Sequence, residues 1–236
     1  MVIRQHFEYP TLERTTLPDG NRFYLDPTDG TPLPSVTTIL SHTKDKTFLV
    51  EWEKRIGKDK ADAIRTQATD IGTLMHTHLE CHIQGIDRPR GSNLIRVMAS
   101  DMADVIIRDG LTLVDEVWGI EVPLYFPQLY AGTTDLIGVY KGKPAIMDYK
   151  NTKKMKTKAM MEDYFCQCVA YALAHNYLYD TCIQQVVIFM CSREHYMDNK
   201  RLEFEAFAIE GAEFERYADI WLKRVAQYDD TGGPRA

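Results

Sequence analysis

The stretch from residue 114 to residue 148 constrains the fold more than any other part of the chain. Its apolar residues follow a strand pattern, whereas helical spacing dominates on either side. The strand-like runs are 114–126, 129–140 and 143–148. Tight reversals at Gln128 and Lys141-Gly142 leave only short connections between them, which favours an antiparallel meander. We therefore expect three consecutive strands of one sheet.

Apolar residues spaced three and four apart predict helices before and after this meander. The expected helices are a short one capped by Ser35, more than one piece over 47–85 with a stop at Gly85, and further helices over 92–107, 158–179 and 214–228. Additional strands are expected at 21–25, 186–191 and 202–209. This order predicts an α/β (α+β) fold, in which a central mixed β-sheet is flanked by helices.

One domain is the default for 236 residues of which 44% are hydrophobic. We expect three parts within residues 1–236. They are a mainly helical N-terminal part at 1–110, the sheet with its following helix at 111–210, and a C-terminal helix with a loose tail at 211–236.

Composition excludes several classes of protein. No apolar run reaches the roughly 20 residues that span a bilayer. The N-terminus also lacks the pattern of a signal or transit peptide, which predicts a cytoplasmic protein with no membrane partner. The five cysteines form no C-x-x-C pair and are odd in number, so neither a disulfide framework nor an iron–sulfur cluster is expected. The net charge of −6 argues against a general nucleic-acid coat, but it allows a local basic strip.

Two acids interrupt the apolar strands of the meander. Asp135 lies in Ala-Gly-Thr-Thr-Asp, and Asp148 precedes Tyr149-Lys150. Because side chains alternate along a strand, Asp148 and Lys150 share a face. Pairing of the two strands would bring Asp135 close to Asp148, where a divalent cation would relieve the repulsion between the carboxylates. The competing interpretation is a solvated strand end and an unrelated turn acid.

The upstream helix carries Gly72-Thr73, His76 and Glu80. His76 and Glu80 are four residues apart and share a helical face, where they can supply a metal ligand and its supporting group. Gly72 lies on the same side and would permit close approach of another backbone. A lone histidine is more often structural, but its combination with Gly72, Thr73 and Glu80 favours a site.

Two polar features follow the lysine. Gln167 and Tyr171 are again four residues apart, so an amide and a phenol can face a phosphate or a base together. The run from Lys150 to Lys158 contains five lysines, Lys153 and Lys154 among them, and can neutralise phosphates. A pair of interfacial side chains and a solvated loop are the alternatives.

Taken in order, these motifs resemble the RecB-like branch of the PD-(D/E)xK nucleases. The matching residues are Gly72-Thr73, His76 and Glu80, then Gly132-Thr133 with Asp135, then Asp148-Tyr149-Lys150, and finally Gln167 and Tyr171. The early Pro34–Leu40 segment and the 48–52 helix are similar to the exonucleases of mitochondrial genome maintenance and to related phage exonucleases. The resemblance thus extends over most of the chain.

The resemblance implies a restriction-endonuclease-like core and a set of roles. His76, Asp135, Asp148 and the Tyr149 backbone carbonyl would bind Mg²⁺ or Mn²⁺, as one or two ions. Lys150 would be catalytic, with Asp135, Asp148 and a water-mediated contribution from Glu80. Residues assigned to DNA binding are Gln167, Tyr171, Ser35, Thr37, Lys153 and Lys154. A helical arch over the site is also implied, with Trp52 available to stack on bases.

The resulting hypothesis is a single nuclease domain that acts as a metal-dependent DNA exonuclease and prefers single strands or free ends. It would serve phage or bacterial DNA processing, with phage or host replication and recombination proteins as candidate partners. A structure- or sequence-specific endonuclease keeps the same chemistry. A non-catalytic DNA-binding recombination accessory protein belongs to another class.

Overall fold

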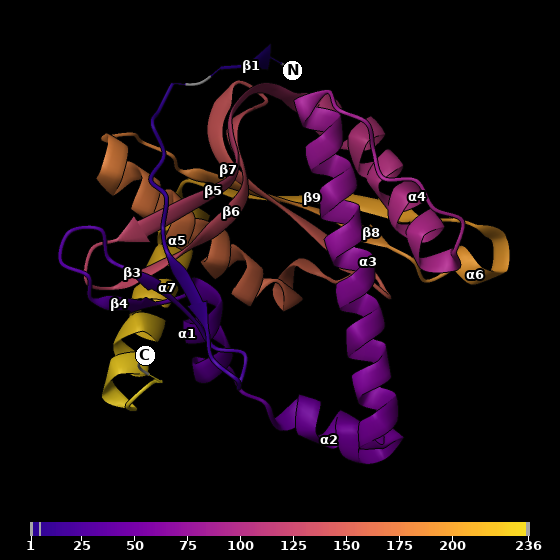
Figure 1. Ribbon diagram of the computed structural model, residues 1–236, viewed down its shortest axis with the longest axis horizontal. Coiled ribbons are helices and arrows are strands. Elements are labelled where there is room, and N and C mark those ends of the chain that lie inside the picture. The colour runs from indigo at the N-terminus through magenta and orange to yellow at the C-terminus, as the bar shows by residue number, and fades with distance from the viewer. Residues whose placement is uncertain (1, 5, 235–236) are drawn as a thin grey trace.

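A six-stranded mixed sheet runs through the middle of the protein, in the order β1-β5-β6-β7-β8-β9 (Figure 1). This computed structural model describes residues 2–4 and 6–234. The strands are β1 (Val2–Ile3), β5 (Val114–Phe126), β6 (Tyr130–Tyr140), β7 (Lys143–Thr152), β8 (Gln185–Ser192) and β9 (Glu203–Glu210). The β1–β5 and β7–β8 pairs are parallel and the others antiparallel, which confirms the predicted mixed sheet.

The predicted meander is confirmed, and its reversals have the expected backbone. Gln128, Lys141 and Gly142 all have positive φ, at 64°, 49° and 78°. The last strand of the meander is longer than predicted, because β7 continues to Thr152. Lys150 therefore lies inside a strand rather than beyond its end.

Helices cover both faces of this sheet. They are α1 (Val36–Thr43), α2 (Thr47–Ile56), α3 (Lys58–Gln84), α4 (Leu94–Asp109), α5 (Glu162–Tyr179), α6 (Tyr196–Asn199) and α7 (Ala212–Asp230), with short 3-10 helices at Leu111–Leu113 and Lys158–Met160. Helices α3 and α4 pack on one face, and α1, α5 and α7 on the other (Figure 1). Each face has its own apolar core, so β8, which lies between β7 and β9, is buried along its whole length.

The alternation along β7 divides its residues between these two cores. Met147 and Tyr149 face α3 and α4, whereas Ile146 packs on the side of α5. Asp148 and Lys150 have the same parity as Ile146 and face α5 as well, which agrees with a contact between Asp148 and α5.

A second, three-stranded sheet was predicted only in part. Its strands are β2 (Arg14–Thr16), β3 (Arg22–Leu25) and β4 (Pro32–Pro34), in antiparallel pairs. Of these, only β3 was expected. Strand β4 begins and ends with proline and lies at an edge, the position where a missing N–H is tolerated. The small sheet packs against β6 through Tyr24, Leu33 and Ala131.

The helical segment after residue 47 breaks at Gly57, which has a φ of 87° and separates α2 from α3. No residue of α2 is buried, and Phe48 is 71% exposed. The predicted stop at Gly85 is confirmed by its left-handed backbone. The tail was expected to be loose, but the N–H of Gly233 donates to the carbonyl of Tyr228 at 2.8 Å. Residues 235 and 236 lie outside the described part.

The five cysteines form no disulfide in the part of the chain that the structure describes. Cys166, Cys168 and Cys191 are buried, Cys81 is half-buried and Cys182 is exposed. Among the same residues, no helix is long and apolar enough to span a bilayer.

An aromatic cluster around His175 of α5 anchors the N-terminal segment. Its Nδ1 and Nε2 atoms lie 2.8 Å from Thr181 Oγ1 and 3.3 Å from Tyr9 Oη. The rings around it belong to Phe7, Tyr9, Trp118 and Tyr179, with centroids 4.8–6.5 Å away. His175 is fully buried, and burial lowers the pKa of its imidazole to about 4.

This burial predicts a pH-dependent stability. At His175, the unfolded chain binds more protons than the folded protein between the ordinary histidine pKa of 6.5 and about 4. The contribution of His175 to the free energy of unfolding should therefore fall with decreasing pH across that window, by up to about 3 kcal/mol. Urea unfolding at several pH values should show His175→Gln losing this dependence. The exposed His82→Gln should retain it, and an equal loss in both variants would refute the assignment.

Candidate functional site

A cleft of about 530 Å³ opens where α3, the β5–β6 hairpin, α5 and the small sheet meet. Its lining includes most of the residues that the sequence singled out. Ser35, Thr37, Gly72, Thr73, His76, Glu80, Gly132, Thr133, Asp135, Gln167 and Tyr171 all contribute. Together with Arg14, Arg22, Tyr24 and Glu121, these residues bring seven separate segments of the chain to one concave surface, the usual form of a binding site.

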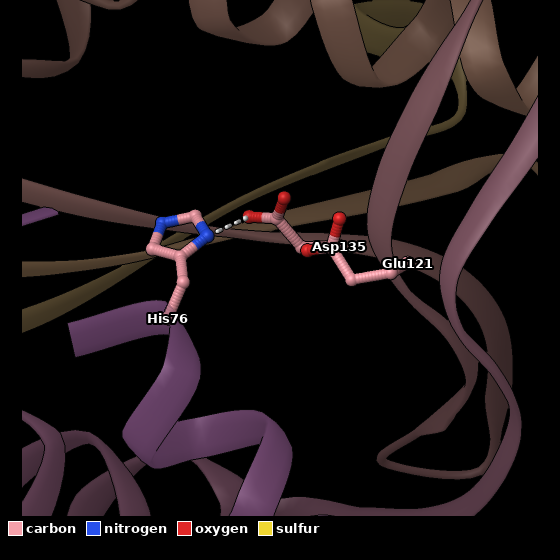
Figure 2. A group of neighbouring side chains, drawn as sticks. All are labelled: His76, Glu121 and Asp135. Carbon is pink, nitrogen blue, oxygen red and sulfur yellow. Dashed lines mark ion pairs between the residues drawn. The ribbon is translucent and has the colours of Figure 1, made fainter. Parts of the chain in front are cut away.

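Three potential ligand atoms converge in this cleft. The nearest ligand atoms of His76, Glu121 and Asp135 all lie within 4.8 Å of one another. Figure 2 shows the imidazole reaching from α3 toward the Asp135 carboxylate, with the Glu121 carboxylate beside it. Such a group of donors matches what a divalent cation requires.

The hydrogen bond of His76 determines what its other nitrogen offers. His76 Nε2 lies 3.0 Å from the carbonyl oxygen of Tyr149, which can only accept, so Nε2 carries the proton. In the neutral imidazole, Nδ1 then presents a lone pair, and it faces Asp135 Oδ2 at 3.5 Å. A lone pair and a carboxylate repel each other unless a cation lies between them, either a proton on Nδ1 or a metal ion.

Glu121 was absent from the predicted site, although the sequence contained a signal for it. Glu121 and Asp135 are each seven residues from the predicted reversal at Gln128. In the hairpin, the pairs Ile120–Leu136 and Val122–Thr134 flank these two acids, which therefore lie opposite each other. Glu121 also has a φ of 49°, which is uncommon for a residue other than glycine and lies here within a strand rather than at a turn.

Asp148 and Lys150 lie next to the converging atoms but do not line the cleft. Asp148 is 1% exposed, its Oδ2 is 2.6 Å from Lys150 Nζ, and its Oδ1 accepts from Gln167 Nε2 at 3.3 Å. The Oδ2 contact lacks good hydrogen-bond geometry and is best described as an ion pair. Asp135 Oδ2 accepts from the N–H of Tyr149 at 2.9 Å, which ties β6 to β7 directly beside Asp148.

The acids influence one another electrostatically. Burial, and then the negative charges of Asp135, Glu80 and Asp148, raise the pKa of Glu121 to about 8, although its side chain is open to the cleft. Burial also raises the pKa of Glu80 and raises that of Asp148 to about 6. Burial opposes the charged form of Lys150, but Asp148 and Asp135 outweigh it and raise the Lys150 pKa, so this side chain remains a cation.

Two motif glycines leave room for particular side chains. A Cβ on Gly132 would lie 2.7 Å from the Tyr171 ring, so Gly132 allows the buried phenol to pack against β6. A Cβ on Gly72 would lie 2.7 Å from Asn151 Nδ2. The expectation that Gly72 accommodates another backbone is therefore wrong, because the close neighbour is the side chain that follows Lys150.

The residues assigned to DNA binding fall into two groups. Ser35 accepts from the N–H of Thr38 at 3.0 Å as the cap of α1, lies 2.9 Å from Thr37 Oγ1, and lines the cleft together with Thr37. Lys153 and Lys154 are exposed after β7 and do not line the cleft, and Lys154 lies 3.8 Å from Glu194.

Gly132→Ala should destabilise the protein, because the added methyl group meets the fixed ring of Tyr171. Overpacking of this kind costs about 1–3 kcal/mol. Thermal or urea unfolding measures the loss. Replacing the ring as well, in Gly132→Ala/Tyr171→Leu, should destabilise less than the sum of the two single variants. Additive effects would show that the contact is not responsible.

Glu121→Gln should weaken Mn²⁺ binding by about tenfold or more, because it removes a charged ligand atom from the converging group. Isothermal titration calorimetry without DNA measures this directly. Glu116→Gln is a matched control on the same strand, since Glu116 pairs with Arg4 at 3.0 Å outside the cleft. Equal affinities in the two variants would remove Glu121 from the site.

Comparisons with known proteins point to exonucleases. No protein-family model matches the chain. The human protein named mitochondrial genome maintenance exonuclease 1 is 26% identical to it over 217 residues, which cover 84% of this chain and 58% of that protein. The chain thus spans a little over half of that relative. A crystal structure of a proposed exonuclease from Eubacterium rectale superposes with a TM-score of 0.50 at 10% identity, covering 70% of this chain and 68% of the other, and supports the fold alone.

Proposed function

We propose that this protein is a metal-dependent DNA exonuclease of the PD-(D/E)xK superfamily, in its RecB-like branch. One observation carries the proposal: the lone pair of His76 Nδ1 faces Asp135, with Glu121 beside it, in a cleft bordered by the Asp148–Lys150 ion pair. The sequence similarity to a human exonuclease supports the same class of activity. The cleft and the surrounding sheet would form one nuclease domain over residues 1–236.

The donors in the cleft fit Mg²⁺ or Mn²⁺. Carboxylate oxygens are ligands for both ions, and the imidazole favours manganese more than magnesium. His76, Glu121 and Asp135 would hold the cation, with Asp148 as a further ligand. The Tyr149 carbonyl, also expected as a ligand, instead accepts from His76 Nε2 at 3.0 Å, away from Nδ1, so it would orient the imidazole. A cation bound there supplies charge neutralisation to a phosphodiester and lowers the pKa of a nearby water. We propose no iron–sulfur cluster.

The protein's own groups have distinct tasks in this proposal. Lys150 stays protonated beside Asp148, so it would stabilise negative charge on the phosphate rather than accept a proton. Gln167 donates to Asp148 and keeps this carboxylate oriented. Glu80 lies close enough to His76 and Asp135 to interact with their charges, and would support the site through water.

We infer a DNA substrate with a single strand or a free end. Ser35 and Thr37 line the cleft and would contact the DNA backbone there. The Thr37 hydroxyl can donate to a phosphate oxygen, whereas the Ser35 hydroxyl donates to Thr38 Oγ1 at 2.9 Å. Gln167 and Tyr171 would contact DNA next to the cation, and Lys153 and Lys154 would attract the backbone from outside the cleft. Action in phage or bacterial DNA processing, alongside replication or recombination proteins, completes the proposal.

End-labelled single- and double-stranded DNA tests the activity, with Mg²⁺, Mn²⁺ or a chelator present. An exonuclease shortens the label-bearing strand from an end and leaves circular single-stranded DNA intact. Cutting of the circle would identify an endonuclease instead. Binding without cleavage under every metal condition would identify a DNA-binding accessory protein.

Loss of the Lys150 charge should reduce Mn²⁺-dependent cleavage by about 10²–10³-fold, the usual effect of removing a group that stabilises transition-state charge. Removing Lys150 alone would leave the buried Asp148 without its ion-pair partner, which destabilises by about 3–5 kcal/mol. The charge-balanced pair Asp148→Asn/Lys150→Met avoids this and should fold while remaining inactive.

Lys143→Met is the matched control for that variant. Lys143 lies at the other end of β7 and pairs with Glu210 at the surface, with 2.7 Å between Nζ and Oε2. Initial rates and thermal unfolding midpoints should be measured together. Full activity in the charge-balanced variant would place the chemistry elsewhere.

A further inference from the structure

A second pocket, of about 380 Å³, adjoins the cleft on the side of the small sheet. Much of its wall is apolar, from Tyr9, Pro10, Leu12 and Pro123. The Tyr9 hydroxyl is already engaged with His175 Nε2 at 3.3 Å. This pocket therefore offers ring and aliphatic surface, in contrast to the acidic cleft next to it.

Four residues line both the cleft and this side pocket, and so form the boundary between them. They are Arg14, Tyr24, Glu121 and Thr133. Tyr24 Oη and Thr133 Oγ1 are 3.3 Å apart, which joins β3 of the small sheet to β6 of the main sheet. Arg14 is the direct partner of Tyr24 in the β2–β3 pair, so its position on the boundary is determined by the register of the small sheet.

Arg14 is the cation of this boundary, and its charge is available. Within residues 2–4 and 6–234, its guanidinium makes no ion pair and no side-chain hydrogen bond, in contrast to Arg65, Arg88, Arg108 and Arg224. It is exposed, yet close enough to Glu121 for its charge to oppose the raised pKa of that acid. A free guanidinium beside the converging carboxylates can bind a phosphate in two-point geometry.

The order of these sites matches the alternation of phosphate and nucleoside along a nucleic acid strand. A cation site for the scissile phosphodiester comes first, the Arg14 guanidinium follows, and an apolar pocket lies beyond it. Nucleobases stack on aromatic surface irrespective of their identity, whereas phosphates require a cation. An isolated anion would make no favourable contact with the apolar pocket, and an apolar ligand would make none with the Arg14 guanidinium.

We propose that Arg14 binds the phosphate next to the scissile one and that the side pocket holds the nucleoside attached to it. The small sheet is then a substrate-positioning element rather than a structural addition. This inference rests on the proposed nuclease function, because it assigns the neighbouring unit of the same DNA strand.

Arg14→Ala should weaken binding of a fluorescent oligodeoxythymidine about tenfold or more in the presence of a chelator, since it removes a charge-assisted contact. Fluorescence anisotropy over a series of salt concentrations measures it. The slope of log K against log salt should fall by about 0.7, the value for one phosphate of a single strand. Arg14→Lys should keep most of the slope, and the exposed Arg201→Ala is the matched control.

Thr11→Trp tests the side pocket separately. Thr11 is exposed and lines this pocket, so the indole should fill it without disturbing the core. Binding should weaken while the salt slope stays unchanged, because no charge is lost. Thr112→Trp, at an exposed position in the 3-10 helix after α4, should bind as the unmodified protein does. Equal thermal unfolding midpoints should accompany both results.

The outcomes separate this inference from the proposed function. Unmodified protein that binds DNA but never cleaves it, together with a reduced slope in Arg14→Ala, would refute the nuclease and support the Arg14 contact. Normal cleavage with unchanged affinity and slope in Arg14→Ala would overturn the contact alone. A changed Mn²⁺ affinity in Arg14→Ala, with an unchanged salt slope of DNA binding, would also overturn the Arg14 contact, since Arg14 would then act only on Glu121.

Discussion

Repulsion among the groups around Asp135 is the constraint on which the rest of this structure depends. Asp135 and Glu121 lie opposite each other in the β5–β6 hairpin, Glu80 of α3 lies near them, and the lone pair of His76 Nδ1 points at Asp135. Leaving these groups together without a cation is unfavourable, and their repulsion adds to burial in raising the pKa of Glu121. The fold tolerates the arrangement because the strands, α3 and the two apolar cores are stabilised elsewhere. The strain thus concentrates where a cation would relieve it.

The two faces of the sheet hold different residues of the site around Asp135. On one face, His76 of α3 donates from Nε2 to the carbonyl oxygen of Tyr149. On the other, α5 presents Gln167 to Asp148, and Lys150 is held by its ion pair. Alternation along β7 places these partners on opposite sides while keeping them within a few residues. A short D-x-K segment in a central strand can therefore connect two helices that do not need to contact each other.

Much of the core and part of the site could be predicted from local pattern. The meander, the helices on either side and the shared face of Asp148 and Lys150 follow from side-chain periodicity, which the backbone enforces. The small sheet was only partly predictable, because its strands have three or four residues and prolines at their ends. Glu121 was missed because it looks like an ordinary exposed strand acid until the hairpin places it opposite Asp135. Gly72 was correctly expected at the site, but its close neighbour is the Asn151 side chain rather than another backbone.

The sequence by itself determined the mixed sheet, the order of its elements and the motif residues, since these depend on periodicity and on interactions between nearby positions. Only the tertiary structure decided which of those residues meet. It placed Glu121 with His76 and Asp135, kept Asp148 and Lys150 behind the cleft wall, and brought Arg14 to the boundary of a second pocket. These contacts join segments that are far apart in the chain. Their geometry depends on strand register and on the packing of helices across a sheet, which no local pattern encodes.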